Sequence, residues 1–145
     1  MIERSEWLHL IPHQGRMALV DRVLHFDNEG LDAESDNHRD PSHPLRRDGV
    51  LRAVHLCEYG AQAMAVHGAL VARASGATAL PGLLVALRAV ELAVERIDHL
   101  PGTLQIQAVR VTTDSSAWLY RFSVRHEGEE LARGQAMVML DNGDT

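Results

Sequence analysis

The chain has 145 residues, of which 46% are hydrophobic and 23% charged, and its formal net charge is -6. This length fits one domain, residues 1–145, with a single core. An acidic chain is a poor candidate for a general nucleic-acid binder, because a phosphate-binding surface usually carries a basic excess. A single cysteine, Cys57, excludes an intramolecular disulfide and fits a reducing cytoplasm.

The first half of the chain predicts a strand pair, a loop and a long helix. Met17–Phe26 is rich in large apolar residues, and an Asn-Glu-Gly turn leads from it to Leu31–Ser35, which predicts a hairpin. Asp36–Asp48 is polar and contains two prolines, so we predict an ordered loop. From about Val50 to Arg73 we predict a helix about 36 Å long, at about 1.5 Å per residue.

Glu58 is the only formally charged side chain from Ala53 to Ala72. A helix that is apolar around most of its circumference is normally buried, and a buried carboxylate without a counter-charge holds its proton more tightly than one in water. Glu58 is therefore a candidate proton donor. The same carboxylate argues against a membrane span, and the acidic start MIERSEWLHL argues against a signal peptide. We expect a cytoplasmic protein.

The second half of the chain predicts antiparallel strands. Leu83–Ile97 fits either a helix or a strand, because helix-forming residues are combined with alternating valine and leucine. Leu104–Ala108 and Trp118–Val124 alternate apolar and polar residues, as half-buried antiparallel strands do, and Leu131–Leu140 completes a meander. Strands, one long buried helix and more strands predict an α+β domain with the sheet packed on the helix.

Two segments of the chain resemble the hotdog-fold β-hydroxyacyl-acyl carrier protein dehydratases. The family's Leu-Pro-His before Leu-Val-Asp-Arg-Val is similar to Leu10–His13 before Leu19–Val23, and Glu58–Ala63 reads Glu-Tyr-Gly-Ala-Gln-Ala. The second segment resembles the Glu-Tyr-x-Ala-Gln-Ala of a divergent branch, the predicted 3-hydroxyacyl-carrier-protein dehydratases that include proteins of aryl-polyene-type clusters. The resemblance covers nearly the whole chain. It implies a hotdog fold, in which an antiparallel sheet wraps around a long central helix.

The resemblance also implies a reaction and a catalytic pair. Family members dehydrate a 3-hydroxyacyl thioester to the 2-enoyl thioester, in fatty-acid or polyene-like biosynthesis, with a loop histidine and a helix carboxylate from opposite subunits of a dimer. Carried over by motif, Glu58 is the carboxylate and His38 the histidine, with His43 as the second choice. The family's loop, His-Phe-Pro-Gly-His-Pro-x-Met-Pro-Gly-Val-Leu, reads HRDPSHPLRRDGVL here, with one residue inserted on each side of His43. Glu58 lies seven residues after Leu51, where the family leaves about three, a difference of about one helical turn.

Dehydration requires a base for the C2 proton, an acid for the C3 hydroxyl and donors to the thioester carbonyl. Histidine suits the first task because it is largely neutral and basic near pH 7, and a desolvated Glu58 suits the second. Free backbone N–H groups of Gly49 and Val50, at the predicted helix start, suit the third. Gln62 lies four residues after Glu58 and therefore on the same helix face, where a hydrogen bond would orient the carboxyl.

The expected substrate is an acyl carrier protein or coenzyme A thioester, and the expected assembly is a homodimer or a hetero-oligomer with another hotdog subunit. We expect no cofactor and no metal. Asp36, His38, Asp40 and His43 match no compact zinc spacing. Four arginines near the loop suit a pantetheine phosphate or an acidic carrier protein: Arg39, Arg46, Arg47 and Arg52.

Two other functions are open at this point. Related hotdog thioesterases hydrolyse acyl thioesters with a helix carboxylate and need no loop histidine. The altered loop spacing also fits a non-catalytic subunit that completes another hotdog protein's site.

Overall fold

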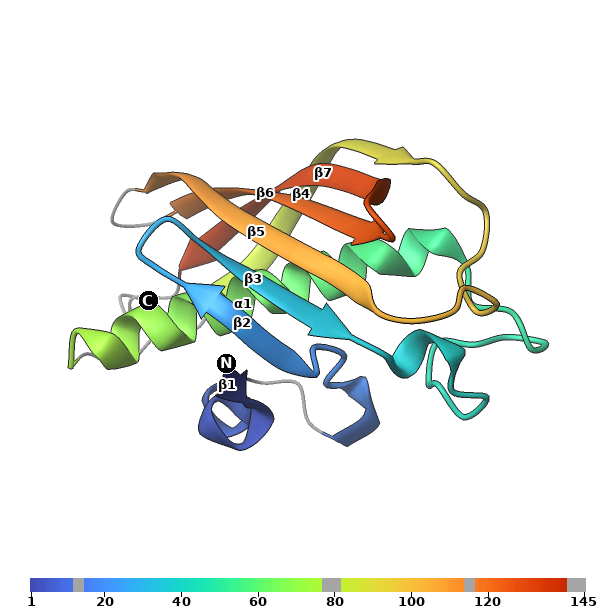
Figure 1. Cartoon of the computed structure of the whole chain (residues 1–145). Coiled ribbons are helices and arrows are strands. Elements are labelled where there is room, and N and C mark those ends of the chain that lie inside the picture. Colours follow the sequence, from blue (N-terminus) through green and yellow to red (C-terminus); the bar gives the residue numbers. More distant parts are fainter. Residues whose placement is uncertain (12–14, 77–81, 114–116, 141–145) are drawn as a thin grey trace.

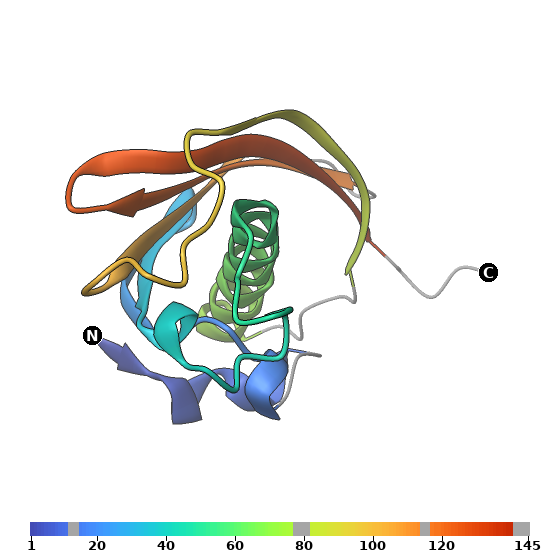
Figure 2. The same cartoon turned by 90° about the vertical axis from the view of Figure 1, so that its right-hand side faces the viewer.

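The computed structural model describes residues 1–11, 15–76, 82–113 and 117–140. A curved antiparallel sheet wraps around α1 (Leu56–Ala74), as Figures 1 and 2 show. The strands of the described residues follow the order β1-β2-β3-β5-β6-β7-β4 across this sheet. Their bounds are β1 Ile2–Glu3, β2 Arg22–Phe26, β3 Gly30–Ser35, β4 Gly82–Leu92, β5 Leu104–Thr113, β6 Ala117–His126 and β7 Glu129–Leu140.

The predicted strands are present, and the segment that was ambiguous between a helix and a strand joins the sheet. The hairpin of β2 and β3 and the meander of β5, β6 and β7 are confirmed. Most of the segment that fitted both a helix and a strand forms β4, which pairs with β7 at the end of the sheet. The expected α+β arrangement, a sheet around a central helix, is confirmed.

The predicted start of the helix is wrong. α1 begins at Leu56, after a 3₁₀ turn, η5 (Ala53–His55), and not at Val50. Val50 and Arg47 exchange two backbone hydrogen bonds of 2.9 and 3.0 Å, and Leu51 accepts one from Ile97. These bonds hold the backbone before Ala53 in a non-helical conformation. Nowhere in the part of the chain that the structure describes does a helix reach the length and hydropathy that a membrane crossing requires.

Close packing between α1 and β6 fixes the depth at which the helix sits in the sheet. A Cβ atom on Gly60 would lie 2.6 Å from the Phe122 ring, whereas one on Gly68 would lie 3.1 Å from the edge of the Trp118 ring. Tyr120 and Phe122 are buried and Trp118 is partly buried against the same core. The expectation that Trp118–Val124 is a half-buried strand is therefore confirmed.

The two helix glycines are expected to respond differently to alanine. At Gly68 a small shift of the Trp118 ring is offset by about 1 kcal/mol of gained helix propensity. At Gly60 the new methyl would meet the rigid base of the Phe122 side chain, and overpacking costs about 1–3 kcal/mol. Urea unfolding of both variants is expected to show Gly60→Ala less stable than Gly68→Ala by at least about 1 kcal/mol. Equal stabilities would contradict the packing described.

Candidate functional site

The candidate site contains a hydrogen-bonded pair, Glu58 and Gln62, on one face of α1. Gln62 is fully buried; its Nε2 donates to Glu58 Oε1 at 3.1 Å and to the Met17 carbonyl at 2.7 Å. Its Oε1 accepts the Leu19 N–H at 2.7 Å. The predicted hydrogen bond between Gln62 and the carboxyl of Glu58 is therefore present, and the amide that makes it is itself held by the backbone.

Glu58 is half-buried, so the expectation of a carboxylate fully removed from water is wrong for the single chain. The cause is the late helix start: Glu58 lies in the first turn of α1 and not in its middle. A position in the first turn places the carboxylate near the end of the helix. The positive end of the helix dipole also lies there and favours negative charge.

His38, in the 3₁₀ turn η4 (Asn37–Arg39), is completely buried. Its Nε2 lies 2.8 Å from the Leu100 carbonyl, and because a carbonyl only accepts, Nε2 carries the proton. The other ring nitrogen, Nδ1, is buried and has no hydrogen-bond partner. His38 therefore keeps one unshared lone pair, the group that a base requires.

His43 differs from His38 because both of its ring nitrogens are engaged. Nδ1 accepts the Leu45 N–H at 3.1 Å, and Nε2 lies 3.0 Å from Tyr59 Oη. The Tyr59 hydroxyl donates to Asn37 Oδ1 at 2.5 Å, so His43 Nε2 must donate to Tyr59. His43 thus has no lone pair left for a substrate in this arrangement.

Gly49 and Val50 do not lie at the helix start. Gly49 is exposed at a turn with a φ of +76°. The Val50 N–H donates to the Arg47 carbonyl at 3.0 Å, so the expectation that it is free for a thioester oxygen is wrong. The reason is the same turn that delays the helix. A role for Gly49 in binding substrate stays a prediction.

The four arginines predicted near the loop fall into two groups, one hydrogen-bonded to the loop backbone and one at the surface. Arg46 donates to the His38 and Gly49 carbonyls at 3.3 and 3.0 Å, and Arg47 donates to the Pro44 carbonyl at 3.2 Å. These two guanidinium groups therefore hold the backbone of the loop through hydrogen bonds. Arg39 and Arg52 are exposed and keep their side chains at the surface. Among the described residues, no three His, Cys, Asp or Glu side chains are grouped as metal ligands would be.

Burial lowers the pKa of three histidines, His38, His43 and His67, because desolvation disfavours the charged ring. The unfolded chain, with histidine pKa values near about 6.5, therefore takes up protons before the folded chain does. The free energy of unfolding is expected to fall as the pH drops below about 6.5, by up to about 1.4 kcal/mol per pH unit for each such ring.

Urea unfolding at about pH 7.5 and 5.5 checks this expectation, because that window spans the ordinary pKa of histidine and lies above the ordinary pKa of Asp and Glu side chains. His67→Gln is expected to reduce the loss of stability on acidification, whereas His25→Gln, at an exposed position, is expected to leave it unchanged. The same loss in wild type and His67→Gln would contradict the expectation.

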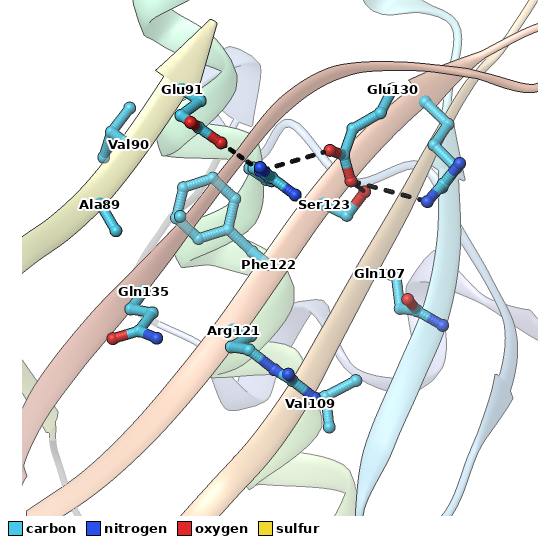
Figure 3. Close-up of a pocket in the computed structure, with 13 residues that line it drawn as sticks. Ala89, Val90, Glu91, Gln107, Val109, Arg121, Phe122, Ser123, Glu130 and Gln135 are labelled. Carbon is cyan, nitrogen blue, oxygen red and sulfur yellow. Dashed lines mark hydrogen bonds and ion pairs between the residues drawn. The ribbon is translucent and has the colours of Figure 1, made fainter.

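A hollow of about 750 Å³ lies on the face of the sheet opposite to α1, formed by β4 to β7. Arg133 forms ion pairs with Glu91 and Glu130, and Ser123 donates to Glu130 at 2.8 Å. Figure 3 shows Glu91, Ser123 and Glu130 around the hollow. None of the predicted site residues lines this hollow. Its charged side chains largely neutralise one another, so it is a polar surface feature and not the candidate active site.

Sequence reasoning missed two polar residues of the site, Tyr59 and Asn37. Tyr59 is fully buried next to Glu58 in α1, and Asn37 precedes His38. The available signal was a tyrosine in an otherwise apolar helix, because a buried tyrosine hydroxyl usually finds a hydrogen-bond partner. The identity of that partner depends on how the loop folds back onto the helix.

Comparison with known proteins assigns the chain to a family. The model of the ApeP-like family, described as ApeP dehydratase, matches residues 6–144. The chain belongs to this dehydratase family. No curated protein matches the chain.

Solved structures show the fold. A chain of the dehydratase heterocomplex ApeI:P from Xenorhabdus doucetiae is 21% identical, with a TM-score of 0.84 over 99% of this chain and 93% of that one. AziG from S. sahachiroi is 16% identical, with a TM-score of 0.64 over 90% and 97%. A hypothetical thioesterase with coenzyme A from Streptococcus pneumoniae is 10% identical, with a TM-score of 0.61 over 83% and 84%. The expected hotdog fold is confirmed.

Proposed function

We propose that this dehydratase removes water from a 3-hydroxyacyl thioester, with Glu58 as the acid for the C3 hydroxyl and His38 as the base for the C2 proton. One observation carries the proposal: Gln62, itself fixed by two backbone bonds, holds the half-buried Glu58 carboxyl in the first turn of α1. A proton donor whose orientation is set in advance suits elimination of hydroxide as water. Membership of the dehydratase family supports the same reaction.

His38 is proposed over His43 because of the free lone pair on His38 Nδ1. His38 Nε2 donates its proton to the Leu100 carbonyl in a hydrogen bond. This bond fixes the tautomer in which Nδ1 is the basic atom. The ring has no exposed surface in the single chain. Gly49 remains the proposed donor to the thioester carbonyl.

The proposed carrier is an acyl carrier protein or coenzyme A, and the proposed assembly is a hetero-oligomer with a second hotdog subunit or a homodimer. A structurally similar chain comes from a dehydratase heterocomplex, which supports the first of these assemblies. The neighbour that is a hypothetical thioesterase with coenzyme A makes thioester hydrolysis the second function to test.

An assay of both products tests the proposal. The purified chain, alone and mixed with a second hotdog dehydratase subunit, is given 3-hydroxyacyl thioesters of a carrier protein and of coenzyme A. Formation of the conjugated enoyl thioester without release of free thiol supports dehydration. Thiol release without enoyl product, or an absence of enoyl product in every mixture, would overturn it.

A further inference from the structure

A closed circuit of hydrogen bonds begins and ends at two neighbouring residues of α1, Glu58 and Tyr59. Gln62 joins Glu58 to the Leu19 N–H, with distances of 3.1 and 2.7 Å. The Leu19 carbonyl accepts from Asn37 Nδ2 at 2.8 Å. Asn37 Oδ1 accepts the Tyr59 hydroxyl at 2.5 Å. The circuit therefore ties α1, the segment before β2 and the turn η4 into one unit.

The direction of every bond in this circuit is determined. The Tyr59 hydroxyl has one proton, which it gives to Asn37, and its oxygen accepts from His43 Nε2 at 3.0 Å. Tyr59 is fully buried and His43 is 5% exposed, so water does not compete for these bonds. Burial also raises the pKa of Tyr59, which keeps its hydroxyl protonated and able to donate. Networks of this kind hold their members more firmly than separate bonds do.

The hydroxyl of Tyr59 is the point at which helix and loop meet. It contacts Asn37, the residue before His38, and His43, five residues after His38. Both ends of the loop segment that contains His38 are thereby attached to one atom of α1. That atom belongs to the residue that follows Glu58.

We propose that Tyr59 is a positioning residue of the dehydratase, which holds η4 and thus His38 in place through Asn37 and His43. This inference rests on the proposed function of Glu58 and His38. Tyr59 touches neither substrate nor reacting atoms; it acts through the loop. A displacement of about 1 Å in a reacting group costs up to about 100-fold in rate.

Tyr59→Phe removes only the hydroxyl oxygen and is the direct test. We expect kcat for dehydration to fall about 10- to 100-fold while KM changes little, because geometry and not binding is lost. Tyr120→Phe is the matched control. Tyr120, in β6, is equally buried, and its hydroxyl bonds His67, which lies further along α1, at 2.8 Å. We expect the control to keep the wild-type kcat.

A double-mutant cycle separates positioning from general loss of structure. If Tyr59 acts through His38, Tyr59→Phe is expected to slow the wild type but to change the rate of His38→Ala by no more than about twofold. Amide hydrogen exchange in residues 37–48 is expected to speed up in Tyr59→Phe and to stay unchanged in Tyr120→Phe. Equal kcat in the two tyrosine variants, or full additivity with His38→Ala, would overturn the inference. An inactive wild type would instead contradict the proposed function, while the exchange measurement still tests the hydrogen-bond link.

Discussion

Glu58→Gln is expected to lower kcat for dehydration by about 100- to 10,000-fold, the range that a positioned general acid contributes. The amide has the same shape as the acid and can still accept the Gln62 bond, but it has no acidic proton for the departing hydroxyl. Steady-state rates of enoyl thioester formation measure the effect. Because the substitution leaves the packing of α1 unchanged, the free energy of unfolding is expected to stay within about 0.5 kcal/mol of wild type.

Glu130→Gln is the matched control for Glu58→Gln. Glu130 is also half-buried and hydrogen-bonded, but it lies in β7 on the face of the sheet away from α1. Its replacement is expected to leave kcat unchanged. A Glu58→Gln variant as active as Glu130→Gln would remove Glu58 from the chemistry.

Gln62→Met is expected to lower the free energy of unfolding by about 2–5 kcal/mol. Methionine has nearly the same length, but it leaves the Leu19 N–H and the Met17 carbonyl inside the protein without their partner. Each unpaired buried group costs about 1–3 kcal/mol. The variant is also expected to lose kcat, because Glu58 loses the donor that orients its carboxyl.

Urea unfolding of Gln62→Met and of a control variant, Gln107→Met, measures the effect on the free energy of unfolding. Gln107 is exposed and makes one side-chain bond, to Asp32 at 3.2 Å. Its replacement is expected to change stability by less than about 0.5 kcal/mol. Equal stability of the two variants would show that Gln62 does not hold the segment before β2.

Local pattern in the sequence predicted those features that depend on neighbouring residues. The alternation in β5 and β6 comes from one buried face per strand, and the bond between Glu58 and Gln62 follows from four-residue spacing on a helix. Periodicity did not decide between a helix and a strand for the segment of β4, because its residues fit both. Pairing with β7 selects the strand. Propensity alone does not contain that information.

Contacts between distant segments explain the failures of the sequence analysis. The start of α1 depends on hydrogen bonds from Leu51 and Ala53 to residues 95–98, more than 40 residues later in the chain. The half-buried state of Glu58 follows from that shift. The pairing of His43 with Tyr59 likewise requires the loop to fold back across 16 residues. No motif spacing reveals which loop histidine keeps a free nitrogen.

The position of bound substrate relative to Glu58 and His38 decides whether these two residues carry the reaction. A crystal structure of the chain in its active assembly with a 3-hydroxyacyl amide, in which nitrogen replaces the thioester sulfur, measures it. We predict that the C3 hydroxyl lies within about 2.6–3.2 Å of a Glu58 carboxyl oxygen and that C2 faces a nitrogen of His38. A C3 hydroxyl that lies out of reach of Glu58, or a ligand bound only in the hollow on the outer face of the sheet, would contradict it.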